Sequence, residues 1–239
     1  MPHTTFNVDE VSEYLHLPRA EVEELVRRGE VPFERAGERA VFRRADIDAW
    51  ASQRILGFSG SHLKDYHRRS TAKAHDLSRE RAIVAELLRP DGVRPGLASK
   101  TKPSLIRDLV QMAVATGLVV YPDDLLRSIE KRERLCSTAL TGGVAMLHPG
   151  HHEPYMFEDS FLLLARTAQP IPFGSPDGQT SDLFFLMCCQ DDRLHLHVLA
   201  RLCMICFHTD ALLRLREAPD AEAMWRAVEA AEADVLKIT

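Results

Sequence analysis

The stretch that decides the fold is Arg132–His148, which reads RERLCSTALTGGVAMLH. Arg132 ends a helical pattern, a Gly-Gly pair follows at 142–143, and the apolar run Val144–Leu147 comes next. The run predicts a short buried strand with His148 directly at its end. A strand that stops on a histidine before a turn places the imidazole at a sheet edge, where loops carry groups that meet partners.

Composition narrows the class of protein. The chain has 239 residues, 45% hydrophobic and 27% charged, which is typical of a globular protein with one large or two small domains. The net charge of −5 argues against a protein that coats nucleic acid. The longest apolar run, Leu183–Cys189, is too short to span a membrane, and the start MPHTTFNVDE lacks a signal-peptide core. Five cysteines without scaffold spacing predict a cytoplasmic location.

Residues 1–56 carry the pattern of a small, mainly helical domain. Thr5 is the expected cap of a first helix, Pro18 separates it from a second, and Gly29 ends the second. A hairpin, or wing, is predicted around residues 36–38, and Asp46 is expected to open a last helix.

The sequence FNVDEVSEYLHLPRAEVEELVRRGEVPFERAGERAVFRRADIDAW resembles the excisionase or MerR-like winged helix-turn-helix family. The resemblance implies duplex DNA as a partner. Residues 1–56 hold eight arginines and eleven carboxylates, a net charge of −3, so a protein-interaction module is the alternative. The candidate DNA-binding residues are Arg19, Arg27, Arg28, Arg39, Arg43 and Arg44.

Residues 57–82 predict a linker, because they are polar and contain Gly-Ser breaks. Their basic second half is interpreted either as a solvated connecting helix or as an arm that helps the first domain onto DNA.

Residues 83–239 alternate apolar runs with helical patterns, which predicts an α/β fold. Strands are expected at 144–147, 161–165 and 183–189, and helices at 104–116, 122–133, 194–207 and 221–236.

Three pieces of this second domain carry a further resemblance. In order they are KRERLCSTALTGGVAMLH, PIPFGSPDGQTSDLFFLMCC and HLHVLARL. Together they resemble the type-2 IIA domain of the bacterial phosphotransferase system, the fructose, mannitol and nitrogen-regulatory class. The resemblance covers about residues 83–238 and implies a mixed sheet flanked by helices.

The resemblance also assigns roles to residues. It implies that His148 is the phosphorylated nucleophile, that Arg132 holds the phosphoryl oxygens, and that His195 at a helix start hydrogen-bonds the phosphate. Ser137 and Thr138 are secondary candidates as hydroxyl donors. Phosphoryl transfer needs a neutral imidazole, cations and correct positioning, so no cofactor is implied.

Two positions depart from the family pattern, which usually has proline before the histidine and glycine after it. Leu147 and Pro149 take those places here, and Pro149 removes a backbone N–H that could donate to a phosphate.

We expect a signalling phosphocarrier that takes phosphate from the histidine carrier protein HPr or its nitrogen-branch relative. The alternatives are a IIA component that feeds a separate IIB permease domain, and a phosphate-independent regulator that binds DNA or protein.

Two other constellations are interpreted without a ligand. The histidines and glutamate in residues 148–153 could suggest a metal, but they have no second ligand pair, so a polar loop is preferred and no metal site is predicted. Cys203 and Cys206 have CxxC spacing inside an apolar helix and are expected to be core thiols.

Overall fold

The computed structural model describes residues 5–15, 17–37, 39–56, 82–150, 156–190 and 192–238. The first unit consists of β1 (Thr5–Phe6), α1 (Val8–Leu15), α2 (Arg19–Arg28), β2 (Glu34–Ala36), β3 (Arg39–Arg43) and α3 (Arg44–Leu56). The second unit begins with α5 (Ile83–Leu87), η1 (Pro90–Gly92), β4 (Val93–Leu97), α6 (Lys102–Ala115), α7 (Pro122–Leu135), β5 (Ala139–Leu140) and β6 (Val144–Leu147). It ends with β7 (Phe161–Ile171), β8 (Ser181–Cys188), α8 (Asp192–His208), α9 (Ala211–Glu217) and α10 (Ala221–Ile238).

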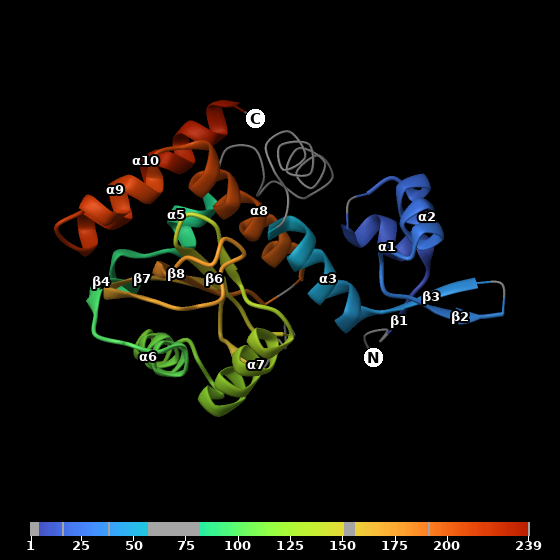
Figure 1. The fold of residues 1–239 in the computed structure, drawn as a ribbon, viewed down its shortest axis with the longest axis horizontal. Coiled ribbons are helices and arrows are strands. Elements are labelled where there is room, and N and C mark those ends of the chain that lie inside the picture. The colour runs from blue at the N-terminus through green and yellow to red at the C-terminus, as the bar shows by residue number, and fades with distance from the viewer. Residues whose placement is uncertain are drawn as a thin grey trace.

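The first unit has the predicted winged helix-turn-helix form, and its small sheet runs in the order β1-β3-β2 (Figure 1). The predicted cap was wrong. Asn7 caps α1, because its Oδ1 accepts the Glu10 N–H at 3.0 Å while the Glu10 carboxylate accepts the Asn7 N–H at 2.7 Å. Thr5 lies in β1 instead, and α3 begins at Arg44, two residues before Asp46.

The second unit is built on a five-stranded mixed sheet in the order β4-β7-β8-β6-β5. β6 pairs in parallel with β8, and β8 pairs antiparallel with β7. The carboxyl ends of the neighbours β6 and β8 therefore lie at the same edge of the sheet. That edge is where the residues that follow both strands are brought together.

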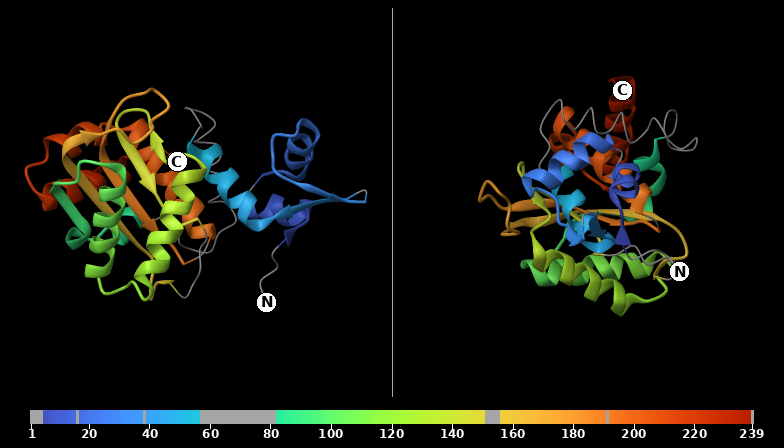
Figure 2. Two further views of the ribbon diagram at one scale, coloured as in Figure 1. Left: turned by 60° about the horizontal axis from the view of Figure 1, so that its bottom comes forward. Right: turned by 90° about the vertical axis from the view of Figure 1, so that its right-hand side faces the viewer.

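Both faces of this sheet are covered by helices. Side chains alternate along β8, so that Phe185 packs toward the cluster containing α8 and α10, whereas Phe184 and Leu186 pack toward α6 and α7. Figures 1 and 2 show these helix layers on opposite faces of the sheet. Burial on both faces explains why β8 is an unbroken apolar run from Leu183 onward.

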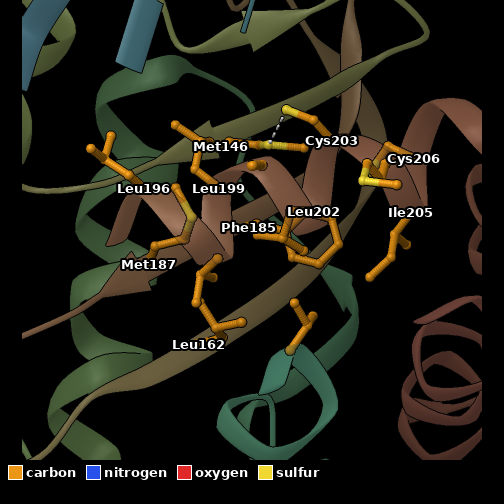
Figure 3. Close-up of a cluster of buried hydrophobic side chains, with 14 of the residues drawn as sticks. Met146, Leu162, Phe185, Met187, Leu196, Leu199, Leu202, Cys203, Ile205 and Cys206 are labelled. Carbon is orange, nitrogen blue, oxygen red and sulfur yellow. Dashed lines mark hydrogen bonds between the residues drawn. The ribbon is translucent and has the colours of Figure 1, made fainter. Parts of the chain in front are cut away.

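The CxxC pair lies in the core, as expected. Cys203 and Cys206 point from α8 into the cluster that contains Met146, Phe185 and Leu202 (Figure 3). Burial raises the pKa of the Cys206 thiol to about 12. Both side chains therefore favour the neutral thiol and contribute to packing rather than to redox or metal chemistry.

Within the described ranges, no single helix is long and apolar enough to cross a membrane. α8 and α9 reach the required length only as a pair, and a bend of 79° separates them. The part of the chain that the structure describes also holds no group of three or more histidine, cysteine or carboxylate side chains suited to a metal. His151, His152 and Glu153 lie outside the described residues.

Candidate functional site: a histidine pair at the carboxyl edge of the sheet

The topology brings together two histidines that are forty-seven positions apart in the chain. His148 directly follows β6, and His195 lies in the first turn of α8, the helix that follows β8. Because β6 and β8 are parallel neighbours, the two rings meet at one edge with their centroids 4.7 Å apart. The structure therefore places the predicted nucleophile and the predicted second histidine in one site.

The contacts of His148 fix which ring nitrogen carries the hydrogen. Its Nδ1 lies 3.0 Å from the carbonyl oxygen of Met146, which only accepts, so Nδ1 carries the hydrogen. Nε2 is then the unprotonated nitrogen, and it accepts a hydrogen bond from Arg132 Nε at 3.0 Å. The ring is neutral in this arrangement, and its lone pair faces the guanidinium.

Arg132 is placed by the last turn of α7, with 2% of its surface exposed. Its Nη1 donates to the Cys136 carbonyl at 3.0 Å, whereas the buried Nη2 has no hydrogen-bond partner among the described residues. Burial lowers the pKa of this guanidinium. A buried cationic donor beside a nucleophilic nitrogen is suited to an anion attached to that nitrogen.

Glu133 was not singled out from the sequence, yet it holds the turn that follows α7. Its carboxylate accepts the Thr138 N–H at 3.0 Å and the Thr138 hydroxyl at 2.7 Å, and it pairs with Lys102 Nζ at 2.7 Å. This turn carries the Cys136 carbonyl that orients Arg132. The Arg-Glu order in the sequence was the only signal that could have identified Glu133.

The two secondary hydroxyl candidates have other partners in the structure. Thr138 donates its hydroxyl hydrogen to Glu133, and Ser137 donates to the Phe173 carbonyl at 2.8 Å. The Ser137 oxygen also accepts the Ala139 N–H at 3.2 Å. Both side chains therefore shape the turn beside Arg132 in this arrangement.

The first unit reaches the site through α3. Ser52 Oγ lies 3.3 Å from His195 Nε2, and Arg44 forms an ion pair with Asp192 at the start of α8. Figures 1 and 2 show α3 lying against the second unit beside α8. Only 2% of the surface of His148, of His195 and of Ser52 remains exposed.

The candidate DNA-binding arginines are largely engaged with carboxylates. The exposed pairs are Arg19 with Asp9 and Glu23, Arg27 and Arg28 with Glu24, and Arg43 with Glu34. Arg39 is exposed at the start of β3. Arg44 differs from the others, because it pairs with the second unit rather than with its own.

Residues 86–231 match the family described as "Phosphoenolpyruvate-dependent sugar phosphotransferase system, EIIA 2". The chain belongs to this EIIA type-2 family. Residues 5–55 separately match a helix-turn-helix domain. Both family expectations from the sequence are confirmed, and the EIIA type-2 match contains Arg132, His148 and His195.

A relative of this EIIA type-2 chain is a nitrogen regulatory protein from Bradyrhizobium diazoefficiens, 31% identical over 145 residues that cover 59% of this chain and 92% of the relative. The fold is similar to nitrogen regulatory protein IIA-Ntr from Neisseria meningitidis, with TM-score 0.55, 22% identity, and coverage of 62% of this chain and 99% of that one. It is also similar to IIA mannitol from Escherichia coli, with TM-score 0.52, 17% identity, and coverage of 59% and 97%. These likenesses confirm the predicted mixed sheet with flanking helices.

Proposed function

We propose that this protein is a phosphohistidine carrier and regulator that accepts phosphate on His148 from an HPr-type protein and signals by its phosphorylation state. Residues 1–56 form the helix-turn-helix part, 57–82 the linker and 83–239 the IIA domain of a cytoplasmic protein. The observation that supports the proposal best is the pairing of a neutral His148 Nε2 with a buried Arg132 that has a donor left over.

The chemistry follows from these contacts. The Nε2 lone pair of His148 attacks phosphorus, the donor's N–P bond breaks, and the electron pair of that bond stays on the donor's imidazole. The ring of His148 gains positive charge as the new bond forms, and the Met146 carbonyl stabilises the Nδ1–H that carries it. Arg132 and His195 are proposed to hydrogen-bond the phosphoryl oxygens, because transfer depends on positioning and charge stabilisation.

The test is phosphoryl transfer to the full-length protein. The protein is incubated with phosphoenolpyruvate, enzyme I and HPr, and the acid-labile phosphate is followed over time to its end point by intact mass. We expect label on the wild type, none on His148→Ala, and slower labelling of His195→Ala and Arg132→Ala. His208→Ala is the matched control, because His208 lies at the far end of the helix that carries His195.

Two results would contradict this assignment. Label that persists in His148→Ala would place the acceptor on another residue. A wild type that stays unlabelled at the end point would favour a phosphate-independent regulator that binds DNA or protein.

A second candidate function is transfer onward to a IIB permease domain. The fold is similar to a IIA mannitol enzyme whose structure was solved in complex with phosphorylated IIB, with TM-score 0.53, 18% identity, and coverage of 60% of this chain and 99% of that chain. Phosphorylated protein mixed with purified IIB domains distinguishes the two functions. Rapid loss of label to one IIB domain would favour the carrier of a sugar system, and retention would favour the regulator.

We propose duplex DNA as a partner of the first unit. Its α2 and its wing lie on the side away from the second unit (Figure 1), so the docked arrangement leaves them accessible. Gel-shift binding of the full chain at several salt concentrations is the test. Absence of a shift at low salt would leave the protein-interaction module as the function of this unit.

A further inference from the structure

The histidine pair is closed off by a part of the same chain. With only 2% of the surface of each residue exposed, His148 and His195 offer no surface of the size that a second protein's phosphorylated side chain needs. In-line attack on phosphorus requires the donor to approach within bonding distance of Nε2. A protein donor therefore reaches His148 only after something moves.

The contacts identify α3 as the element that lies on the site. Ser52 of α3 hydrogen-bonds His195 itself, and Ala51 beside it is 3% exposed. Ile47 and Ala51 of α3 belong to the same continuous hydrophobic cluster as Leu196, the residue after His195. The helix α3 therefore covers the site, through a polar contact to His195 and apolar packing around it. We call α3 in this position the cover.

An ion pair secures this cover at the start of α8. Arg44 binds Asp192, a carboxylate that is 3% exposed and lies three residues before His195, on the same face of the helix. A buried carboxylate that loses its cation is strongly disfavoured. Arg44 therefore links the first residue of α3 to the turn that carries His195.

We propose, on the basis of the phosphocarrier function above, that α3 is an intramolecular competitor of the phosphodonor. Docked α3 closes the site, and phosphoryl transfer to His148 requires α3 to leave α8. The helix-turn-helix unit then has two positions, one held against the IIA domain and one released. The state of the first unit is thereby coupled to the access of the donor to His148.

The chain connection allows such a release. Residues 57–82 join α3 to α5, and an extended chain reaches about 3.3 Å per residue. A connection of that length does not itself fix α3 on α8. The contacts of Arg44, Ser52 and the apolar residues of α3 are what hold it there.

Two variants of the full chain are designed to release α3 from α8. Each has as its control the same substitution at the neighbouring residue. Arg44→Glu places two negative charges together at the α3–α8 contact, whereas Arg43→Glu makes the same change at a residue that pairs with Glu34 inside the first unit. Ser52→Arg inserts a long side chain at a buried position. Gln53→Arg inserts it at the adjacent exposed one.

Two measurements are made on all five proteins, the wild type and the four variants. The first is the rate at which diethyl pyrocarbonate modifies His148 and His195, mapped by peptide mass. The second is the initial rate of labelling by phosphorylated HPr. We expect both rates to rise about tenfold or more in Arg44→Glu and Ser52→Arg, the change that a loss of ~1.4 kcal/mol in closing free energy produces. Both controls should behave like the wild type.

The outcomes separate the two proposals. Equal modification and labelling rates in all five proteins, with label present, would overturn the cover and leave the phosphocarrier intact. Faster modification of the released variants with no label on any protein would support the cover and contradict the phosphocarrier. Faster modification and faster labelling of the released variants alone would support both.

Discussion

Two arginines of the IIA domain are almost completely buried, and they differ in what compensates their charge. Arg201 in α8 is 0% exposed and pairs with Glu232 of α10 at 3.2 Å. Arg132 is 2% exposed, and its Nε meets the nitrogen of a neutral imidazole. Burial lowers the pKa of both guanidinium groups. The two arginines are equally buried but unequally compensated, so we expect Arg201 to be structural and Arg132 to be available to a ligand.

The surroundings of Glu232 support this distinction. Its carboxylate also accepts the N–H groups of Val84 and Ala85, at 3.0 and 2.8 Å, at the start of α5. The Arg201 pair therefore connects three helices. The carboxylate next to Arg132 in the sequence is that of Glu133. The oxygens of Glu133 bind Thr138 and Lys102 rather than Arg132.

The largest expected effect is on stability, at the pair formed by Arg201 and Glu232. Glu232→Ala removes the carboxylate that pairs with the buried Arg201, and we expect a loss of about 3–5 kcal/mol in the free energy of unfolding. Urea unfolding measures it. Glu229→Ala, an exposed position on the same helix, should change stability by less than ~0.5 kcal/mol. A loss below 1 kcal/mol at Glu232 would mean that the pair does not compensate Arg201 as described.

The second expected effect is on the rate of phosphoryl transfer, at Arg132. Arg132→Ala should lower the rate of phosphoryl transfer to His148 by about 10²–10³-fold, as removal of one donor to a developing charge does. Arg132→Lys should recover part of that rate, because it restores the charge but not the fork of donors. Single-turnover labelling with phosphorylated HPr measures both. If Arg132→Ala instead lowers stability and leaves the rate unchanged, Arg132 is a second structural arginine.

The exposed arginines of α2 extend the comparison to the surface. Glu24→Gln removes the carboxylate shared by Arg27 and Arg28, which leaves Arg28 only the longer contact to Glu30 at 4.0 Å and makes both cations more available to phosphates. We expect tighter duplex binding, with a log-log salt slope steeper by about 1 to 2 units. Gel-shift titration at three salt concentrations measures the slope. An unchanged slope would show that α2 does not face the DNA.

The smallest effect belongs to a pair that is exposed on both sides. Arg226 and Glu222 in α10 are i,i+4 partners at 2.9 Å, with side chains 70% and 51% exposed. Arg226→Ala should change the free energy of unfolding by less than ~0.5 kcal/mol. The same urea titration tests this, and a loss comparable to that of Glu232→Ala would remove burial as the explanation for the difference.

The sequence predicted residues that the structure brings together, but little of what surrounds them. A family resemblance predicts Arg132, His148 and His195 as site residues. The parallel pairing of β6 and β8 brings the two histidines together, and Arg132 reaches His148 from the last turn of α7. The contact of Ser52 with His195 was not predictable, because Ser52 looks like an ordinary helix residue until two separate units are placed together. Glu133 was missed because its contacts to Thr138 and Lys102 depend on how the turn after α7 folds.

The strands of the fold were likewise predictable only where a segment carries a clear apolar pattern of its own. β8 was predicted within two residues at either end, because its two buried faces give a continuous apolar run. β7 continues to Ile171, beyond the expected end at 165, through exposed residues 168–170 that carry no apolar signal. β4 was missed because Val93–Leu97 contains a proline and a glycine, which usually argue against a strand.

The hydrogen bond from His148 to the Met146 carbonyl determines which neighbouring residues control the ring. The ring takes its tautomer from the strand before it, so the residues after it do not set the reactive nitrogen. Pro149 removes one donor from the loop, but the next N–H, that of Gly150, donates to Ser128 of α7 at 3.0 Å. The group that sets the tautomer thus precedes the histidine in the chain, so we expect a substitution at Pro149 to leave Nδ1 as the nitrogen that carries the hydrogen.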